Sequence, residues 1–256
     1  MSDRQEYAMQ SDMERRYCFT EQEFLILAGS LEIRQMYGFK PEEPVRTDER
    51  EVYQQLFKMT KKGFLEASED GYLVIPEIRE MFHYIKEAES VITICAVDDS
   101  FPEKCIYPGE KTVMMESGGL KGKYYKCSYG TMRKVWEQLC ESGMLLAQNV
   151  ADDMLYDAVP IHPLLPEDVR LLDMVDQTSA MSGAEEREKM RECGIRTILE
   201  QRDITGTQPV KRLFLVERPV YDEIFVQDEN GMRIFHYSKQ LLLELLTEWV
   251  KGGDAQ

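Results

Sequence analysis

The sequence lacks the features that would place it in a membrane or an export pathway. Its 256 residues contain no apolar run that approaches the roughly 20 residues of a membrane-spanning helix. The N-terminal stretch 1–17 is polar and has no apolar signal-peptide core. We therefore expect a folded cytoplasmic protein with no membrane segment, long enough for one large domain or two small ones.

Residues that build covalent or metal sites are few and dispersed. The six cysteines form no C-x-x-C pair, which favours reduced thiols in a cytosolic protein. The three histidines, His83, His162 and His236, belong to three distant segments, so we expect no metal site. No nucleophile-elbow, zinc-protease, dinucleotide-binding or kinase-type motif occurs. These absences predict a protein that is not an enzyme and needs no cofactor.

Basic residues are outnumbered by acidic ones. There are 31 Lys and Arg against 47 Asp and Glu, which gives a formal net charge of −16. Such a charge repels nucleic acid and anionic lipid at long range. Nucleic acid and membrane are therefore not expected partners, although a local basic patch is compatible with this balance.

The C-terminal stretch 210–250 has the pattern strand, strand, strand, helix. Asn230-Gly231 separates two β-rich runs, which predicts a hairpin with a type I′ turn. The final helix is expected to begin after Ser238, a suitable N-cap residue. Its apolar residues recur at helical spacing: Leu241, Leu242, Leu245, Leu246 and Trp249.

Both faces of these C-terminal strands carry bulky apolar side chains, whereas the helix after them can cover only one face. Aromatic side chains on a solvent-exposed face would be unusual, because such a face normally alternates with polar residues. The candidates for the second face are Tyr221, Phe225, Phe235 and Tyr237. Either another part of the chain buries them, or a protein partner docks on them.

An upstream stretch, 91–143, repeats the same order of elements. Strands are expected at 91–99, 110–117 and 123–129, with a helix after them and a loop-rich middle at 98–122. The sequence thus predicts an α+β fold, with a mainly antiparallel sheet built from two related β-β-β-α units, 91–143 and 210–250. A helical segment joins them, with one helix starting at Pro166 and a highly charged helix from Ala184 to Leu199.

Residues 1–88 have the outline of a winged-helix module. Thr20 to Glu23 forms a capping-box pattern before the first helix, and Thr47 is the expected cap of the second. Two short strands at 64–67 and 72–75 and a helix from Pro76 follow. We assign 1–88 to this helical module and 89–256 to the α+β region, packed as two domains or as one.

A winged helix raises a second interpretation, a transcriptional regulator whose C-terminal part senses a signal or dimerises. The second helix offers four candidate DNA contacts: Arg50, Lys58, Lys61 and Lys62. The turn of the wing opposes this interpretation, because its acidic residues would face phosphate: Glu66, Glu69 and Asp70.

The order of elements resembles that of the EspG family, the secretion-specific chaperones of type VII (ESX) systems. The resemblance rests on the helix-to-strand passage Lys61 to Leu65 and on the two sheet-plus-helix stretches, Val91 to Gly143 and Val210 to Val250. It covers most of the chain as a pattern. The resemblance implies a non-catalytic protein that binds a helical secreted partner in the cytosol.

Overall fold

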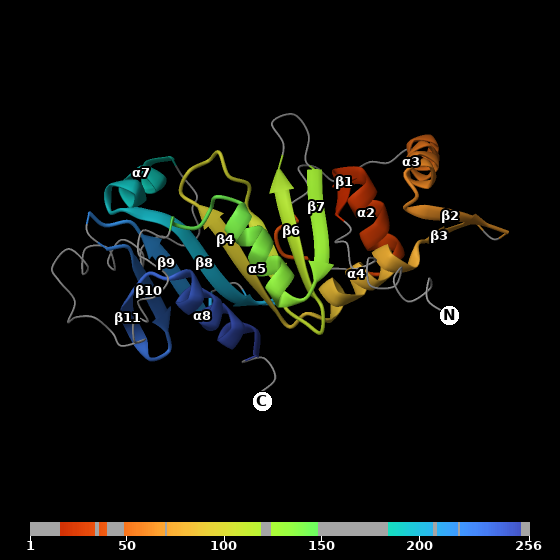
Figure 1. Cartoon of the computed structure of the whole chain (residues 1–256). Helices are drawn as coiled ribbons and strands as arrows, with labels where there is room; N and C mark the ends of the chain where they lie inside the picture. The colour runs from red at the N-terminus through yellow and green to blue at the C-terminus, as the bar shows by residue number, and fades with distance from the viewer. Residues whose placement is uncertain are drawn as a thin grey trace, which may run out of the picture.

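The structure is a computed structural model that describes residues 16–33, 36–39, 49–69, 71–118, 124–147, 184–206, 209–219 and 221–251. Within these residues, nine strands form one large sheet and two strands form a separate hairpin (Figure 1). No helix in this part of the chain is long and apolar enough to cross a membrane. The described helices are α2 (Glu21–Ser30), α3 (Glu49–Lys61), α4 (Pro76–Glu87), α5 (Met132–Glu141), α7 (Ala184–Glu192) and α8 (Lys239–Lys251).

Every neighbouring pair of strands in the large sheet is antiparallel, which confirms the predicted fold class. The hairpin consists of β2 (Leu65–Ser68) and β3 (Gly71–Val74). From one edge to the other, the strands of the large sheet are β1 (Tyr17–Thr20), β7 (Tyr124–Gly130), β6 (Thr112–Gly118), β5 (Lys104–Tyr107), β4 (Ser90–Ala96), β8 (Ile195–Asp203), β9 (Lys211–Val216), β10 (Glu223–Asp228) and β11 (Gly231–His236).

The sheet consists of two units that meet at its centre. β4 and β8 pair there along their whole shared length, from Ser90 opposite Asp203 to Ala96 opposite Thr197. Moving outward, β5, β6 and β7 follow on one side, and β9, β10 and β11 on the other. Helices α4 and α5 flank the first unit in the chain, and α7 and α8 flank the second. Each unit has the predicted order of strands followed by a helix, but with four strands rather than three.

The two additional strands lie where the sequence predicts a loop and a helix. β5 falls inside the stretch 98–122, and all four of its residues are buried, so it shows no alternation of polar and apolar positions. β8 begins at Ile195, because α7 ends at Glu192 and Gly194 adopts a φ of +82°. Glycine takes a positive φ readily and often ends a helix in this way. The prediction of one helix from Ala184 to Leu199 is therefore wrong beyond Glu192.

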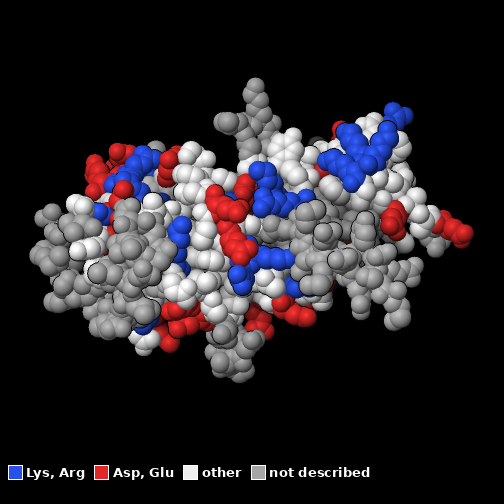
Figure 2. Space-filling view, viewed as in Figure 1, with Lys and Arg blue, Asp and Glu red and all other residues white. Residues whose placement is uncertain are grey.

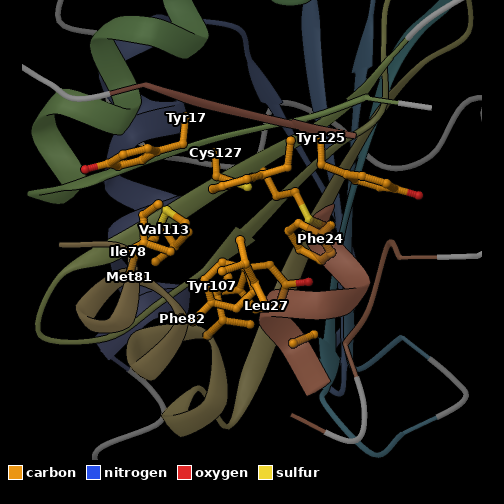
Figure 3. Packing of buried hydrophobic residues seen from close by; sticks show 14 of the residues in the cluster. Tyr17, Phe24, Leu27, Ile78, Met81, Phe82, Tyr107, Val113, Tyr125 and Cys127 are labelled. Atoms are coloured by element: carbon orange, nitrogen blue, oxygen red, sulfur yellow. The ribbon is translucent and has the colours of Figure 1, made fainter. Parts of the chain in front are cut away.

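Helices cover both faces of the sheet, and strand residues alternate between them. Ile92 and Ile94 of β4 pack in one core with α5 and α8, whereas Val91 packs on the opposite face with α4. Phe24 of α2 and Phe82 of α4 lie in that second core, together with residues of β5, β6 and β7 (Figure 3). A third cluster joins α7 to β8, β9, β10 and β11.

The N-terminal elements belong to the core of the large sheet. Thr20 caps α2 as predicted: its backbone N–H donates to the Glu23 carboxylate at 2.9 Å, and its hydroxyl accepts the Glu23 N–H. Met59 of α3, Leu65 of β2 and Val74 of β3 are buried in the same cluster as β5, β6 and β7. The boundary predicted between residues 88 and 89 stays a prediction, and described packing contacts run across it.

The C-terminal hairpin and helix form as predicted, but the turn differs. The Ser238 hydroxyl accepts the Leu241 N–H at 3.0 Å and caps α8. Gly231, opposite Asp228, has a φ of +98°, whereas neither Glu229 nor Asn230 has a positive φ. The turn is therefore not type I′, which needs positive φ at both central residues. Three predicted features lie outside the described residues: the helix start at Pro166, the cap Thr47 and the turn residue Asp70.

Candidate functional site

The histidines lie on separate elements in the described part of the chain. His83 of α4 has its Nδ1 atom 3.9 Å from Glu87, and the ring of His236 on β11 lies 5.3 Å from that of Tyr221. His162 is outside the described residues. No group of three or more His, Cys, Asp or Glu side chains among the residues that the structure describes has the arrangement of a metal site.

A hollow of about 500 Å³ lies between the end of β4, residues 143–147 and the start of β8. Its lining is partly apolar and includes two arginines, Arg191 and Arg196. The Arg191 guanidinium donates to the Val97 carbonyl at 3.3 Å, and Arg196 pairs with the Glu217 carboxylate. The cations that would orient a small anionic ligand are thus already engaged by groups of the protein.

One shared face is predicted for four aromatic residues, Tyr221, Phe225, Phe235 and Tyr237. In the structure, Phe225 lies opposite Ile234 and Phe235 lies opposite Ile224, so the two rings point to opposite faces of the sheet. Phe225 packs in the cluster with α7, whereas Phe235 and Tyr237 pack in the core with α8. Only Tyr221 of the four is exposed. The prediction that these residues share one face is wrong, because the hairpin register places the rings in two different cores. Of the two alternatives, burial by the chain itself holds for Phe225, Phe235 and Tyr237.

Tyr237 instead anchors the segment that follows α5. Its hydroxyl donates to the Leu146 carbonyl at 3.1 Å, and the Thr197 hydroxyl of β8 donates to the Met144 carbonyl. Burial raises the pKa of Tyr237 well above its ordinary value. The hydroxyl therefore stays protonated at physiological pH and remains a donor.

Helix α3 and the β2–β3 hairpin project from one end of the large sheet (Figure 1). We call α3, β2 and β3 together the arm. A turn through Gly63, which has a φ of +72°, carries the chain from α3 into β2. The Phe64 N–H donates to the Met59 carbonyl at 2.9 Å in this turn. The buried side chains of Met59 and Leu65 attach the arm to the core.

The four basic residues predicted as alternative DNA contacts all belong to the arm region, but they do not act as one group. Lys62 lies 2.7 Å and 2.9 Å from the two carboxylate oxygens of Glu23, which is 1% exposed. Arg50, Lys58 and Lys61 are exposed on α3, where Figure 2 shows a basic patch. Lys62 is therefore a structural contact between α3 and α2, and the other three remain surface cations.

The arm also carries exposed apolar side chains that were not among the predicted site residues. Tyr53 and Phe57 on α3 are 66% and 56% exposed, and Tyr72 and Leu73 on β3 are 42% and 52% exposed. Four of the seven large hydrophobic side chains that are exposed in the described part of the chain thus lie on the arm. For the two residues of α3 a sequence signal exists. Tyr53 and Phe57 are four residues apart and so lie on one side of the helix, beside the buried stripe that ends at Met59.

Basic, acidic and apolar side chains lie next to one another on the arm. The Lys61 ammonium lies 4.6 Å from the centre of the Phe57 ring, within cation–π range. The register of the hairpin places Tyr72 on the same face as the buried Val74, and Leu73 on the other face beside Glu66. Glu66 and Glu69 are exposed, so the hairpin is acidic where α3 is basic. Such a surface has apolar anchors with flanking charges, as protein-binding surfaces do.

Comparison with known proteins finds likeness of fold without likeness of sequence. No protein-family profile matches the chain, and neither does any curated protein. Among solved structures, the chain is similar to the type VII secretion system chaperone EspG5 of Mycobacterium tuberculosis, in its complex with a PE25–PPE41 dimer. The TM-score is 0.51 at 13% sequence identity, covering 90% of this chain and 93% of that chain. The two proteins thus share a fold over nearly their whole lengths.

Proposed function

We propose that this protein is a non-enzymatic chaperone of the EspG kind, which binds a helical protein destined for secretion and acts in the cytoplasm. The observation that carries the proposal is the fold shared with EspG5 over 90% of this chain, since EspG5 is described as a chaperone in complex with a protein dimer. Fold alone does not determine function, so the surface must supply a binding site as well.

The arm supplies such a surface. More than half of each of the Tyr53 and Phe57 side chains is exposed, although exposing large rings to water costs free energy. Grouped apolar side chains on a protein surface commonly mark a contact site. Protein binding therefore accounts for the exposure of these rings, which packing within the chain does not explain.

The exposed cations of α3 favour a second candidate, the winged-helix regulator. A DNA-reading helix places such cations against phosphate. The neighbouring carboxylates of Glu66 and Glu69 and the net charge of −16 oppose this reading, because both repel phosphate. Tyr53 and Phe57 also share α3 with the cations, and they suit a protein contact better. Protein binding therefore ranks first.

Affinity purification of the full-length chain from the cells that make it tests the proposal. We expect one stoichiometric partner whose far-ultraviolet circular dichroism is helical and which is exported in the presence of this protein. Deleting the gene for this protein should leave that partner aggregated or degraded inside the cell. Recovery of the chain alone, or with nucleic acid in place of a protein, would overturn the proposed function.

A further inference from the structure

The exposed side of α3 carries an ordered stripe of residues. Arg50, Tyr53, Phe57 and Lys61 follow one another at steps of three or four, so they lie on one side of the helix. The buried Met59 lies on the opposite side. We propose that this stripe is the docking site for an acidic amphipathic helix of the partner protein, an inference that rests on the proposed chaperone function.

The aromatic residues supply the apolar part of the site. Tyr and Phe provide a large contact area with few rotatable bonds, so little conformational entropy is lost on binding. The Lys61 ammonium already lies over the Phe57 ring, which restricts both side chains before a partner arrives. A helix with an apolar stripe would bury both rings.

Charge indicates that the docking helix is acidic. From residue 50 to residue 61, the exposed charged side chains are three cations, Arg50, Lys58 and Lys61, and one carboxylate, Glu51. The whole chain carries a net charge of −16, so most of its surface repels an acidic partner. The local basic patch would steer acidic side chains to α3 and away from other surfaces.

The shape of the arm favours a helix over an extended strand as the occupant. α3 has 13 residues and is therefore about 20 Å long, which matches three to four turns of a second helix packed along it. By contrast, β2 and β3 have four residues each and offer only a short edge for strand pairing. Duplex DNA and an anionic membrane are broader than a single helix and would also face the exposed Glu66 and Glu69 of the hairpin, whereas a helix packed along α3 can bind there without contacting them.

The arm is positioned before binding. The buried Glu23 carboxylate holds Lys62 at the end of α3, and Met59 and Leu65 lie in the core on either side of the turn. A surface fixed in this way loses less entropy on binding than a flexible one. These contacts hold α3, and with it the stripe, in place against the core.

The test uses full-length protein and the partner purified with it. The affinity of the wild-type chain for this partner is compared by calorimetry with those of two double variants, Tyr53→Ser with Phe57→Ser and Lys58→Glu with Lys61→Glu. A third double variant, Tyr124→Ser with Tyr221→Ser, is the control, because these tyrosines are 46% and 51% exposed and lie off the arm. We expect each arm variant to weaken binding about tenfold or more, and the control by less than about twofold.

Charge exchange tests the chemistry of the partner. Hydrogen exchange identifies the partner helix that is protected in the complex, and acid-to-lysine changes on that helix should restore binding to the Lys58→Glu, Lys61→Glu variant. If the protected segment is not helical, or if no exchange of charge restores binding, the acidic helix is the wrong occupant. If the aromatic double variant has a markedly lower melting temperature than the wild type, the Lys58→Glu, Lys61→Glu variant alone tests the docking site.

Two further probes separate the other outcomes. Random-sequence duplex DNA and vesicles of phosphatidylglycerol with phosphatidylcholine are titrated under the same conditions. Binding of either probe that depends on Lys58 and Lys61 but not on Tyr53 and Phe57 would overturn the inference. A partner that binds all three variants equally well would overturn the docking site and leave the proposed function standing. A wild-type chain that binds no protein would overturn both.

Discussion

The ammonium group of Lys62 lies 2.7 Å from one carboxylate oxygen of Glu23 and 2.9 Å from the other. Glu23 is 1% exposed, and its carboxylate also accepts the Thr20 N–H at 2.9 Å. One buried carboxylate thus completes the cap of α2 and holds the end of α3 against it. Together with the buried side chains of Met59 and Leu65, this contact holds the arm against the core.

We predict that Glu23→Ala lowers the free energy of unfolding by about 2–3 kcal/mol, because it removes both the cap and the acceptor of Lys62. Lys62→Met should cost about 1 kcal/mol, since its side chain is partly exposed. Lys61→Met is the matched control and should change stability by less than about 0.5 kcal/mol. Urea unfolding measures all three. Equal stabilities of the two lysine variants would argue against a structural role for Lys62.

Different burial predicts different effects for two aromatic residues in and next to the C-terminal hairpin. Phe225 is fully buried, so Phe225→Ala should cost about 3–5 kcal/mol through lost burial and the cavity that remains. Tyr221 is 51% exposed, so Tyr221→Ser should cost at most about 1 kcal/mol. Guanidinium unfolding of both variants checks this. A Phe225 variant as stable as the wild type would mean that this ring is not in the core.

Glycine is required at the junction between α7 and β8. At Gly194, with its φ of +82°, an added Cβ atom would lie 2.5 Å from the Glu217 carbonyl oxygen. We predict that Gly194→Ala lowers the unfolding free energy by about 2 kcal/mol or more through strain and steric contact. Gly29→Ala in α2 is the control, because nothing lies within 4 Å of its added Cβ atom. That change should stabilise the protein by up to about 1 kcal/mol, and thermal unfolding measures both.

A carboxyl on α4 should make stability depend on pH in the acid range. The Glu80 carboxylate accepts hydrogen bonds from Lys111 at 2.6 Å and from the Tyr84 hydroxyl at 3.1 Å. The Lys111 hydrogen bond lowers the pKa of Glu80 below its ordinary value of 4.5, although burial opposes this shift. A carboxyl with a lowered pKa stabilises the fold above its unfolded pKa, and this contribution is lost as the pH falls through its folded pKa.

We therefore predict that part of the loss of melting temperature below about pH 4.5 comes from Glu80. The melting temperatures of the wild type, Glu80→Gln and Lys111→Met are measured from pH 7 to pH 3. Both variants should lose less stability than the wild type over this interval, because the ion pair is already absent at neutral pH. An identical acid slope in all three proteins would contradict the prediction.

Patterns of neighbouring residues predicted those elements whose defining contacts are local. The capping box of α2 joins Thr20 and Glu23, which are three residues apart, and Ser238 caps α8 over the same separation. The hairpins β2–β3 and β10–β11 likewise form around short turns at predicted places. The order of strands and helix in the two units was predicted for the same reason, apart from β5 and β8.

The candidate site was only partly predictable. The cations of α3 were visible because basic residues stand out in an acidic sequence, and Arg50, Lys58 and Lys61 are exposed as surface contacts require. Lys62 could not be separated from them, because its partner Glu23 is 39 residues away in the chain. Exposure of Tyr53 and Phe57 was not predicted, because aromatic residues on an amphipathic helix are usually buried.

Local patterns in the chain were enough to predict the α+β class, most helices and the hairpins, because helix caps, turns and apolar periodicity act over a few residues. Tertiary structure alone decided the strands β5 and β8 and the pairing of Ser90 with Asp203 at the centre of the sheet. It also decided that Phe225 and Phe235 enter different cores. A strand buried on both faces loses its alternation, and a shift of one residue in register moves a side chain to the other face.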